Sequence, residues 1–466
     1  MPEAGSDHGD VLAAMLAPQS VVLIGASRRT DSLGGRLLPI LRQHGYAGRV
    51  YLVNPSGEPI LGEPTYRSVA DLPSPAETAV VVVAADRVAA VLDECGRHGI
   101  RRAIVLSSGF DERRDELGAT RQRELEAVRV RHGLRLLGPN CEGVLSVAER
   151  TPLTFSPAVD LERALRQVPE PGAVAVVSQS GGLGFALFHD GAERGLRFSY
   201  VVSTGNECDV DVLDVLELLL SGGATSVVLC FVEGVRDLDR FADLVGRASS
   251  RQMTVVCAKV GRSPAGARGA LAHTAHEAGD SERFEEALRS SGGIVARDQE
   301  ELVDLGLAFE RAPRWSSGGV AVLSISGGAG VWAADACVAE GLEVPLLGAD
   351  VQERLRPLMP AYGSALNPVD VTAAALSTGG LVAPLEIILG LGEVGAVLVV
   401  GSFGGPAQLR LEGDDLGRIV RASGKPVVVY SYTRPGRESI ELFGAAGLAW
   451  YPSPGRAARV LAALRC

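Results

Sequence analysis

Short apolar runs of strand length alternate along this chain with stretches of helical periodicity, and this alternation restricts the fold more than any other feature. The first series of runs covers residues 21–24, 50–53, 79–83, 103–106 and 134–137. A helical pattern, residues 87–98, lies between two of these runs. Strands that are apolar on both faces and alternate with amphipathic helices are typical of a parallel sheet covered by helices on both sides. The sequence therefore predicts an α/β fold with a doubly wound sheet.

Two further series of strand-like runs follow the first. The second covers residues 173–177, 200–202, 227–231 and 254–258, and the third begins at Val320. A length of 466 residues also fits roughly three domains. We expect these domains at residues 1–148, 149–312 and 313–466. Segments 149–171 and 311–319 are expected to be connections.

The third series repeats motifs of the second in the same order. VAVVSQSGGLG at residues 174–184 matches VAVLSISGGAG at residues 320–330 at eight of eleven positions. Further along, Asn-Glu-Cys-Asp-Val at 206–210 is echoed by Asn-Pro-Val-Asp-Val at 367–371. Ordered echoes of this kind predict two related α/β domains in tandem.

Charge and composition exclude several function classes. The net charge is −11 and no basic stripe is present, which argues against a nucleic-acid partner. The longest apolar runs, such as residues 79–85, are too short for a membrane helix, and the acidic residues 1–10 do not resemble a signal peptide. The cysteines are scattered without a C-x-x-C pair, so neither a disulfide framework nor a metal site is expected. We expect a cytoplasmic protein without membrane contact.

The first candidate site is the turn after the first strand, from Gly25 to a helix near Arg36. A glycine-bearing turn of this kind presents backbone N–H groups and the positive end of a helix, which suits a nucleotide phosphate. The second strand ends in Val53-Asn54-Pro55 without the acidic residue that would bind a ribose, so NAD is disfavoured. An ordinary βα turn without a ligand is the alternative.

Two Ser-x-Ser-Gly-Gly turns form the second candidate site. They place Ser180, Gly181 and Gly182 at one helix start, and the second helix start carries Ser326, Gly327 and Gly328. Small residues let an anion approach the amides of the first helical turn. Two such turns in related domains could hold one phosphate from opposite sides. Alternatively, serine and glycine serve there only as capping and turn residues.

Histidine is scarce in the chain, and His273 and His276 lie close together in a segment, 259–279, that we expect to be a polar loop after a strand. Loops at the carboxyl ends of parallel strands commonly carry catalytic residues. Two histidines three residues apart supply too few ligands for a metal. Glu233, at the end of the run 227–232, could orient an imidazole. The alternatives are solvated surface histidines and, for Glu233, an acidic residue at a helix start.

With these motifs in order, the sequence resembles the α subunit of the NDP-forming acyl-CoA synthetases, the superfamily of succinyl-CoA synthetase and the ADP-forming acetyl-CoA synthetases. The resemblance covers nearly the whole chain. The motifs that carry it are 20–27, 53–55, 107–110 and 138–141 in the first domain, 177–182, 203–206, 232–234 and 272–274 in the second, and 367–370 in the third. It implies a Rossmann-like CoA-binding domain followed by two tandem flavodoxin-like domains.

The resemblance also implies an activity. Acyl-CoA, phosphate and NDP would become a free acid, CoA and NTP through an acyl phosphate and a phosphohistidine. The phosphohistidine falls on His273, its partner carboxylate falls on Glu233, and both Ser-Gly-Gly turns face the phosphate. The residues implied to bind CoA are Gly25, Ala26, Ser27, Arg28, Arg29, Asn54, Pro55, Ser108 and Asn140.

The chain departs from the family pattern at the histidine. The usual Ser-His-Thr-Gly is Ala272-His-Thr-Ala275, and His276 is an additional imidazole. No ATP-grasp domain follows the third domain, so the resemblance implies a separate ATP-grasp β subunit that binds ATP or ADP with Mg²⁺, in an α2β2 assembly. Two alternatives stay open: a catalytically silent regulator that binds CoA or acyl-CoA, and an enzyme of another acyl-transfer reaction.

Overall fold

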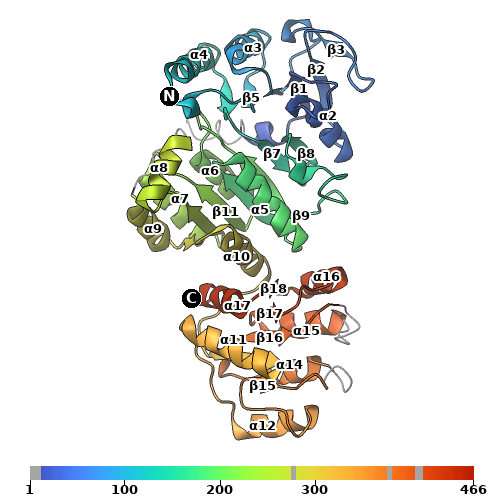
Figure 1. Ribbon diagram of the computed structural model, residues 1–466, viewed down its shortest axis with the longest axis vertical. Coiled ribbons are helices and arrows are strands. Elements are labelled where there is room, and N and C mark those ends of the chain that lie inside the picture. The colour runs from blue at the N-terminus through green and yellow to red at the C-terminus, as the bar shows by residue number, and fades with distance from the viewer. Residues whose placement is uncertain (1–11, 274–279, 375–379, 405–412) are drawn as a thin grey trace. The chain divides into compact units, whose positions relative to one another are not determined.

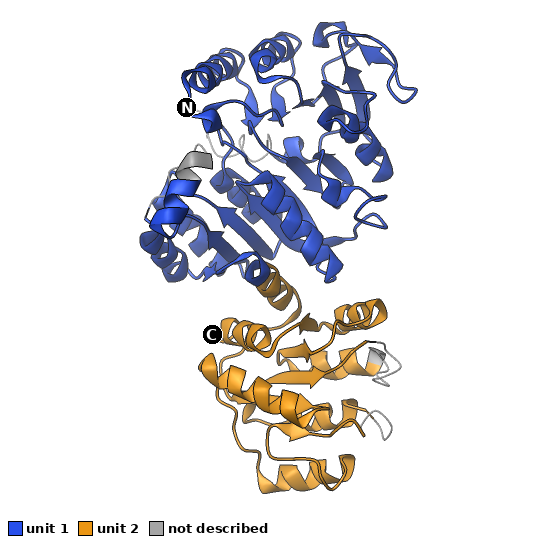
Figure 2. Cartoon of the chain, viewed as in Figure 1, with its two compact units in different colours: residues 1–302 blue, residues 303–466 orange. Residues whose placement is uncertain are grey.

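The structure is a computed structural model that describes residues 12–273, 280–374, 380–404 and 413–466. The chain divides into two compact units, residues 1–302 and 303–466 (Figure 2). The boundary between the units falls inside helix α10 (Gln299–Arg311). None of the helices in the described segments combines the length and the apolar composition that crossing a membrane requires.

The first sheet of the first unit has the strand order β3-β2-β1-β4-β5-β6, which is the order of Rossmann folds. Figure 1 labels β1, β2, β3 and β5 of this sheet. Its pairings are parallel throughout. The strands are β1 (Ser20–Ile24), β2 (Arg49–Val53), β3 (Thr65–Tyr66), β4 (Thr78–Val81), β5 (Arg102–Val105) and β6 (Arg135–Leu137), and the helices are α2 (Leu33–Gln43), α3 (Ala85–Arg97) and α4 (Glu116–His132).

Helices cover both faces of this sheet because its strands are apolar on both sides. Val21 and Leu23 of β1 belong to the cluster that contains the buried leucines of α2. Val22 and Ile24, which point the other way, belong to the cluster of α3 and α4. The doubly wound sheet predicted from the apolar runs is therefore confirmed.

The second sheet has the order β13-β12-β11-β9-β10-β7-β8. Its parallel part, read from β10, follows the 2-1-3-4-5 order of flavodoxin-like folds. Its strands are β7 (Gly143–Ser146), β8 (Thr151–Thr154), β9 (Pro171–Ser178), β10 (Phe198–Ser203), β11 (Val227–Val232), β12 (Thr254–Lys259) and β13 (Ile294–Val295). The helices that accompany it are α5 (Gly181–Glu193), α6 (Val212–Gly222), α7 (Leu238–Ser250), α8 (Pro264–His273) and α9 (Ser281–Ser290).

The antiparallel hairpin of β7 and β8 extends this second sheet, because β7 pairs with β10. Sequence reasoning did not predict the hairpin. It assigned the segment from residue 149 to a connection, whereas β8 forms a buried strand there. The proposed domain boundary after residue 148 falls between the two strands of the hairpin.

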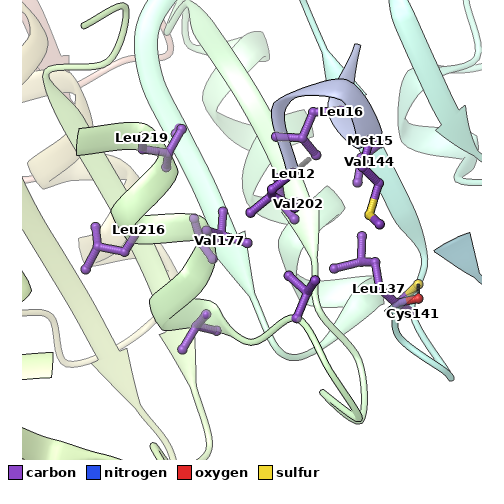
Figure 3. Packing of buried hydrophobic residues seen from close by; sticks show 14 of the residues in the cluster. Leu12, Met15, Leu16, Leu137, Cys141, Val144, Val177, Val202, Leu216 and Leu219 are labelled. Atoms are coloured by element: carbon purple, nitrogen blue, oxygen red, sulfur yellow. Dashed lines mark hydrogen bonds between the residues drawn. The ribbon is translucent and has the colours of Figure 1, made fainter. Parts of the chain in front are cut away.

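The first two sheets share one hydrophobic core (Figure 3). Residues 12–16 contribute Leu12, Met15 and Leu16, which lie in one cluster with Leu137 of β6 and Val177 of β9. The cluster continues through β10 to Leu216 and Leu219 on α6. Because apolar side chains from both sheets exclude water together, the loops of the two sheets are held in a fixed relation.

The second unit contains the third sheet, with the order β15-β14-β16-β17-β18. This is again the 2-1-3-4-5 order, so the tandem pair predicted from the sequence repeat is confirmed. The strands are β14 (Gly319–Ser324), β15 (Val369–Asp370), β16 (Val394–Gly401), β17 (Val427–Ser431) and β18 (Ala449–Tyr451). The helices are α11 (Gly327–Ala339), α12 (Ala349–Leu355), α14 (Val382–Leu389), α15 (Gly413–Ser423), α16 (Arg437–Ala446) and α17 (Pro454–Ala463).

Candidate active site

The turn between β1 and α2 is tightly folded. The Gly25 N–H donates to the carbonyl oxygen of Val53 at 3.0 Å, and Gly25 has a φ of +91°, which favours glycine. The Ser27 N–H donates to the carbonyl oxygen of Gly34 at 3.3 Å. A Cβ atom at Gly34 would overlap the carbonyl oxygen of Gly25. The glycines therefore let the start of α2 approach the end of β1 closely.

Asn54 joins this turn from the end of β2. Its Nδ2 donates to the carbonyl oxygen of Ala26 at 2.8 Å, so the predicted CoA residues Ala26 and Asn54 are in contact, and Pro55 follows Asn54 directly. Arg28 and Arg29 are exposed, and Arg29 forms an ion pair with the exposed Asp31. The cationic side chains of the turn thus lie in solvent rather than in the fold's interior.

Ser108 and Asn140 lie on two neighbouring loops of the same sheet. Ser108 is exposed, and the preceding carbonyl group, that of Ser107, accepts a hydrogen bond from the Asn140 N–H at 2.9 Å. The Asn140 Nδ2 donates to Asn206 Oδ1 at 3.1 Å, and Asn206 belongs to the loop between β10 and α6. The predicted CoA loops therefore meet the second sheet at this point.

Helix α5 begins at the first Ser-Gly-Gly turn. The Ser178 Oγ donates to the carbonyl oxygen of Ser180 at 2.6 Å, and Ser180 makes no side-chain capping bond to α5 in the part of the chain that the structure describes. Gly182 is exposed. The first N–H groups of a helix have no partner within the helix, and this helix start is suited to an anion.

The second Ser-Gly-Gly turn has the same internal geometry in the other unit. The Ser324 Oγ donates to the carbonyl oxygen of Ser326 at 2.7 Å, and Ser326 provides no side-chain cap for α11 among the described residues. Gly327 and Gly328 are both exposed. Each turn therefore presents a helix start of the same kind, and their action on one phosphate stays a prediction.

Glu142 lies against the start of α5. A Cβ atom at Gly181 would lie 2.7 Å from Glu142 Cβ and 3.2 Å from Glu142 Oε2. The Glu142 N–H donates to Ser203 Oγ at 3.1 Å, and its carbonyl oxygen accepts a hydrogen bond from Thr154 Oγ1. Burial raises the pKa of the Glu142 carboxyl, and a hydrogen bond with Ser156 acts in the opposite direction. Sequence reasoning gave this carboxyl no role.

Glu233 follows β11 and is 7% exposed. Its N–H donates to Gln179 Oε1 at 2.6 Å, and its carbonyl oxygen accepts from Lys259 Nζ at 3.2 Å. Lys259 is buried at the end of β12, and burial lowers its pKa. The backbone of Glu233 is therefore held from two neighbouring strand ends, close to the α5 turn.

His273 is the last residue of α8. The sequence predicted a loop over 259–279, and this was wrong for the ten residues of α8. Alanines at 265, 267, 270 and 272 favour a helix more than the intervening Gly266 and Gly269 oppose it. Residues 274–279, including His276, lie outside the described residues, and the contact of His273 with Glu233 stays a prediction.

Gln179, Glu207 and Lys259 are polar residues of this site that sequence reasoning did not assign. They are 4%, 1% and 4% exposed, respectively. The available signal was the repeat itself, because a glutamine at position 179 replaces the apolar Ile325 of the second copy. A polar side chain at a position that the related domain fills with an apolar one indicates a special partner.

Comparisons with known proteins agree with this architecture. Family models described as "CoA binding domain", "Succinyl-CoA ligase like flavodoxin domain" and "Ligase-CoA domain" match residues 19–146, 171–309 and 320–392. The chain is 33% identical over 463 residues to the acetate–CoA ligase [ADP-forming] I subunit alpha of Pyrococcus furiosus, and the match covers 97% of both chains. It is 38% identical over 358 residues to acetate–CoA ligase [ADP-forming] I of Archaeoglobus fulgidus, covering 77% of this chain.

The chain spans about half the length of some of these relatives, since the match covers 50% of the Archaeoglobus protein and 50% of the 4-hydroxybutyrate–CoA ligase [ADP-forming] of Nitrosopumilus maritimus. Among solved structures, acetyl-coenzyme A synthetase 1 of Ca. Korarchaeum cryptofilum matches with a TM-score of 0.83 and 29% identity, covering 97% of this chain and 96% of that chain. A second structure of that protein is described as a complex with phosphate and ADP. The shared domains and this full-length similarity show that the chain belongs to the ADP-forming acyl-CoA synthetases, the family that its motifs predicted.

Proposed function

We propose that this chain is the α subunit of an ADP-forming acid–CoA ligase, which interconverts acyl-CoA, ADP and phosphate with a carboxylic acid, CoA and ATP. The observation that carries the proposal is the joining of two sheets by one core, with CoA-type loops on the first sheet and the buried Glu233 beside an uncapped helix start on the second. The alignment with a relative named as an alpha subunit over 97% of both chains supports it.

CoA would bind over the carboxyl end of the first sheet. Gly25, Ala26 and Ser27 would offer backbone and hydroxyl groups to its phosphates, and Arg28 and Arg29 would add charge-assisted hydrogen bonds. Asn54, Pro55, Ser108 and Asn140 would line the same edge. The contact of Asn140 with Asn206 supports this arrangement, because it places a CoA loop next to the second sheet, where phosphate would react.

The chemistry would proceed in two transfers. A phosphate oxygen attacks the thioester carbonyl carbon, the carbon–sulfur bond breaks, and CoA leaves as the thiol with the proton that phosphate gives up. The His273 imidazole then attacks the phosphorus of the acyl phosphate, the phosphorus–oxygen bond breaks, and the free acid leaves as a carboxylate. Glu233 would hold the other ring nitrogen, and the helix starts at Ser180 and Ser326 would stabilise the phosphoryl charge.

The nucleotide would bind to a partner. A separate ATP-grasp β subunit would supply ADP or ATP with Mg²⁺ and take the phosphoryl group from His273, in an α2β2 assembly. The Pyrococcus furiosus relative that the chain matches over 97% of both chains is named as an alpha subunit, which supports a separate partner subunit.

The proposal is tested by incubating the chain with an ATP-grasp partner, labelled ATP, CoA and a panel of small carboxylic acids. We expect acid-labile phosphate on the chain and formation of a CoA thioester. If CoA binds but no label or thioester forms with a competent partner, the chain is a silent CoA-binding protein, a reading that Ala275 in place of glycine would favour.

CoA recognition can be measured without a partner. We expect calorimetry on the full chain to detect CoA binding and no binding of NAD, because the end of β2 carries Asn54 where a ribose-binding carboxylate would stand. Changing both Arg28 and Arg29 to alanine should weaken CoA binding roughly tenfold, since each charge-assisted phosphate contact contributes about 1.5–3 kcal/mol when fully formed and less in solvent. Binding of NAD instead of CoA would contradict the assignment.

We expect Glu233 to affect the rate of histidine labelling rather than the affinity for CoA. Changing Glu233 to glutamine keeps the shape of the side chain and removes its charge, so His273 would lose the partner that stabilises its charged form. We expect labelling to slow by roughly 100-fold, at the lower end of general acid–base contributions, while CoA affinity stays unchanged. The labelling rate is measured by quenching reactions with ATP and the partner at a series of times. A wild-type rate in the Glu233→Gln variant would remove Glu233 from the mechanism.

A further inference from the structure

The side-chain amide of Gln179 connects three strand ends of the second sheet. Its Oε1 accepts hydrogen bonds from the backbone N–H groups of Glu233, at 2.6 Å, and Gly234, at 3.2 Å. Its Nε2 donates to Glu207 Oε2 at 2.9 Å and to the carbonyl oxygen of Gly234 at 2.8 Å. The amide thus uses all its donors and its acceptor to join the ends of β9 and β11 with the loop after β10.

Glu207 fixes the orientation of this amide. It is 1% exposed, and its Oε1 accepts from Thr204 Oγ1 at 2.8 Å and from the Val212 N–H at 3.0 Å. A carboxylate accepts hydrogen bonds and does not donate them, so it must face the NH₂ side of Gln179. The oxygen of the amide is therefore turned toward the backbone of Glu233.

The related domain builds the same fold without this amide. Gln179 corresponds to Ile325, because their backbone N–H groups make equivalent hydrogen bonds. The Gln179 N–H donates to the carbonyl oxygen of Phe231 at 3.1 Å, and the Ile325 N–H donates to the carbonyl oxygen of Val400 at 3.1 Å. Ile325 is 5% exposed, so it fills the equivalent buried place with an apolar side chain. The fold itself therefore does not require a polar side chain at this position.

The side chains of Glu207 and Glu233 are replaced in the related domain as well. Counted from the equivalent bonds that the Thr204 and Val371 N–H groups make to the carbonyl oxygens of Ser178 and Ser324, Glu207 corresponds to Ala374. Counted from the equivalent bonds at Phe231 and Val400, Glu233 corresponds to Ser402. The three polar residues thus occur together in the copy whose sequence also carries His273, and all three are replaced in the other copy.

We infer that Gln179, oriented by Glu207, is a positioning residue for Glu233. It sets the location of the Glu233 backbone relative to the first turn of α5, which begins two residues after Gln179 in the chain. This inference rests on the proposed function, in which Glu233 acts on His273 and α5 holds the phosphoryl group. Burying a carboxylate and an amide costs free energy unless both are hydrogen-bonded, which is consistent with a role beyond folding.

The test uses the full chain and acetyl phosphate, a small acyl phosphate, as the phosphoryl donor, so that no partner subunit is needed. The readout is the rate of acid-labile labelling of His273 at saturating and low acetyl phosphate. Three variants are compared: Q179I, which copies the related domain, Q179E, and the interchanged pair Q179E/E207Q. CoA affinity and the midpoint of thermal unfolding serve as controls for folding.

We expect Q179I to bind CoA with wild-type affinity and to label roughly 10- to 100-fold more slowly at saturating acetyl phosphate, because small displacements of catalytic groups have effects of that size. Q179E should label more slowly still, since two carboxylates would face each other in the interior. The pair Q179E/E207Q should recover part of that loss, because the bond between residues 179 and 207 is restored with donor and acceptor interchanged, while the carboxylate oxygen would still face the Gly234 carbonyl oxygen.

Wild-type labelling by Q179I would overturn the inference and leave the proposed function intact. If Q179I does not fold, the comparison of Q179E/E207Q with Q179E decides. Labelling of Q179E/E207Q that is no faster than labelling of Q179E would also overturn the inference. Label on a residue other than His273 would instead contradict the proposed function, as would absence of labelling in the wild-type chain with the acyl phosphates of all the acids in the panel.

Discussion

Changing His273 to alanine is expected to remove all acid-labile, alkali-stable phosphate from the chain when it is incubated with labelled ATP and its partner. In the proposed mechanism the phosphohistidine is a covalent intermediate, so no other group would carry the phosphoryl between the acyl phosphate and the nucleotide once the imidazole is gone. Ligase activity should fall by at least roughly 10³-fold, as is found when a covalent nucleophile is removed. CoA binding should be unchanged, because the loops proposed to bind CoA belong to the first sheet.

His276 supplies the matched control for this experiment. It is an imidazole three residues further along the same segment, and changing it to alanine removes the same atoms from the chain. Most labelling should remain in this variant, because His273 and not His276 precedes Thr274, as in the family motif. Loss of label in the His276 variant alone would reverse the assignment.

The fold was predictable because its strands are buried on both faces. A strand such as β11, with all its residues buried, has to be an uninterrupted apolar run, and such runs are visible without any alignment. The tandem relation of the second and third sheets was also visible, because the two Ser-x-Ser-Gly-Gly turns repeat in sequence as they do in hydrogen bonding.

The hairpin and α8 were not predictable by the same signals. Strand β8 reads Thr-Pro-Leu-Thr, and its proline and short length are typical of a connection, yet as the outermost strand of the sheet it has room for a residue without an N–H donor. In α8 the glycines indicated a loop, while the alanines between them determined the structure.

The polar network around Glu233 depends on contacts between residues distant in the sequence. Gln179 and Glu207 are 28 positions apart, and Gln179 and Glu233 are 54 positions apart. They meet because β9 lies between β10 and β11 in the sheet. Sequence reasoning identified Glu233 from its place at the end of an apolar run and from a family motif. The repeat marks Gln179 as unusual, but it does not show that Gln179 and Glu207 contact each other and Glu233, since strand order is a property of the whole sheet.

Close packing in the turn between β1 and α2 predicts that a substitution at Gly34 has a large effect on stability and on CoA affinity. This residue is the second in α2, and a Cβ atom there would overlap the Gly25 carbonyl oxygen and approach Val82 Cγ1 to 3.3 Å. The turn has little room to move, because the Gly25 N–H is bonded to Val53 and the neighbouring Ile24 carbonyl to the Val82 N–H. Changing Gly34 to alanine should therefore cost about 1–3 kcal/mol of stability and deform the turn proposed to bind CoA.

Gly455 is the matched control for Gly34, since it is also the second residue of its helix, α17, and no atom of the described residues lies within 4 Å of the place where its Cβ would be. Alanine at Gly455 should leave CoA affinity unchanged and raise stability by up to about 1 kcal/mol, because alanine favours the helix more than glycine does. Calorimetric titration with CoA and thermal unfolding measure both variants.

We expect at least a roughly tenfold loss of CoA affinity for Gly34→Ala, equivalent to about 1.4 kcal/mol. Wild-type CoA affinity in a destabilised Gly34→Ala chain would mean that CoA does not contact this turn, because the substitution cannot be accommodated without moving the backbone of Gly25.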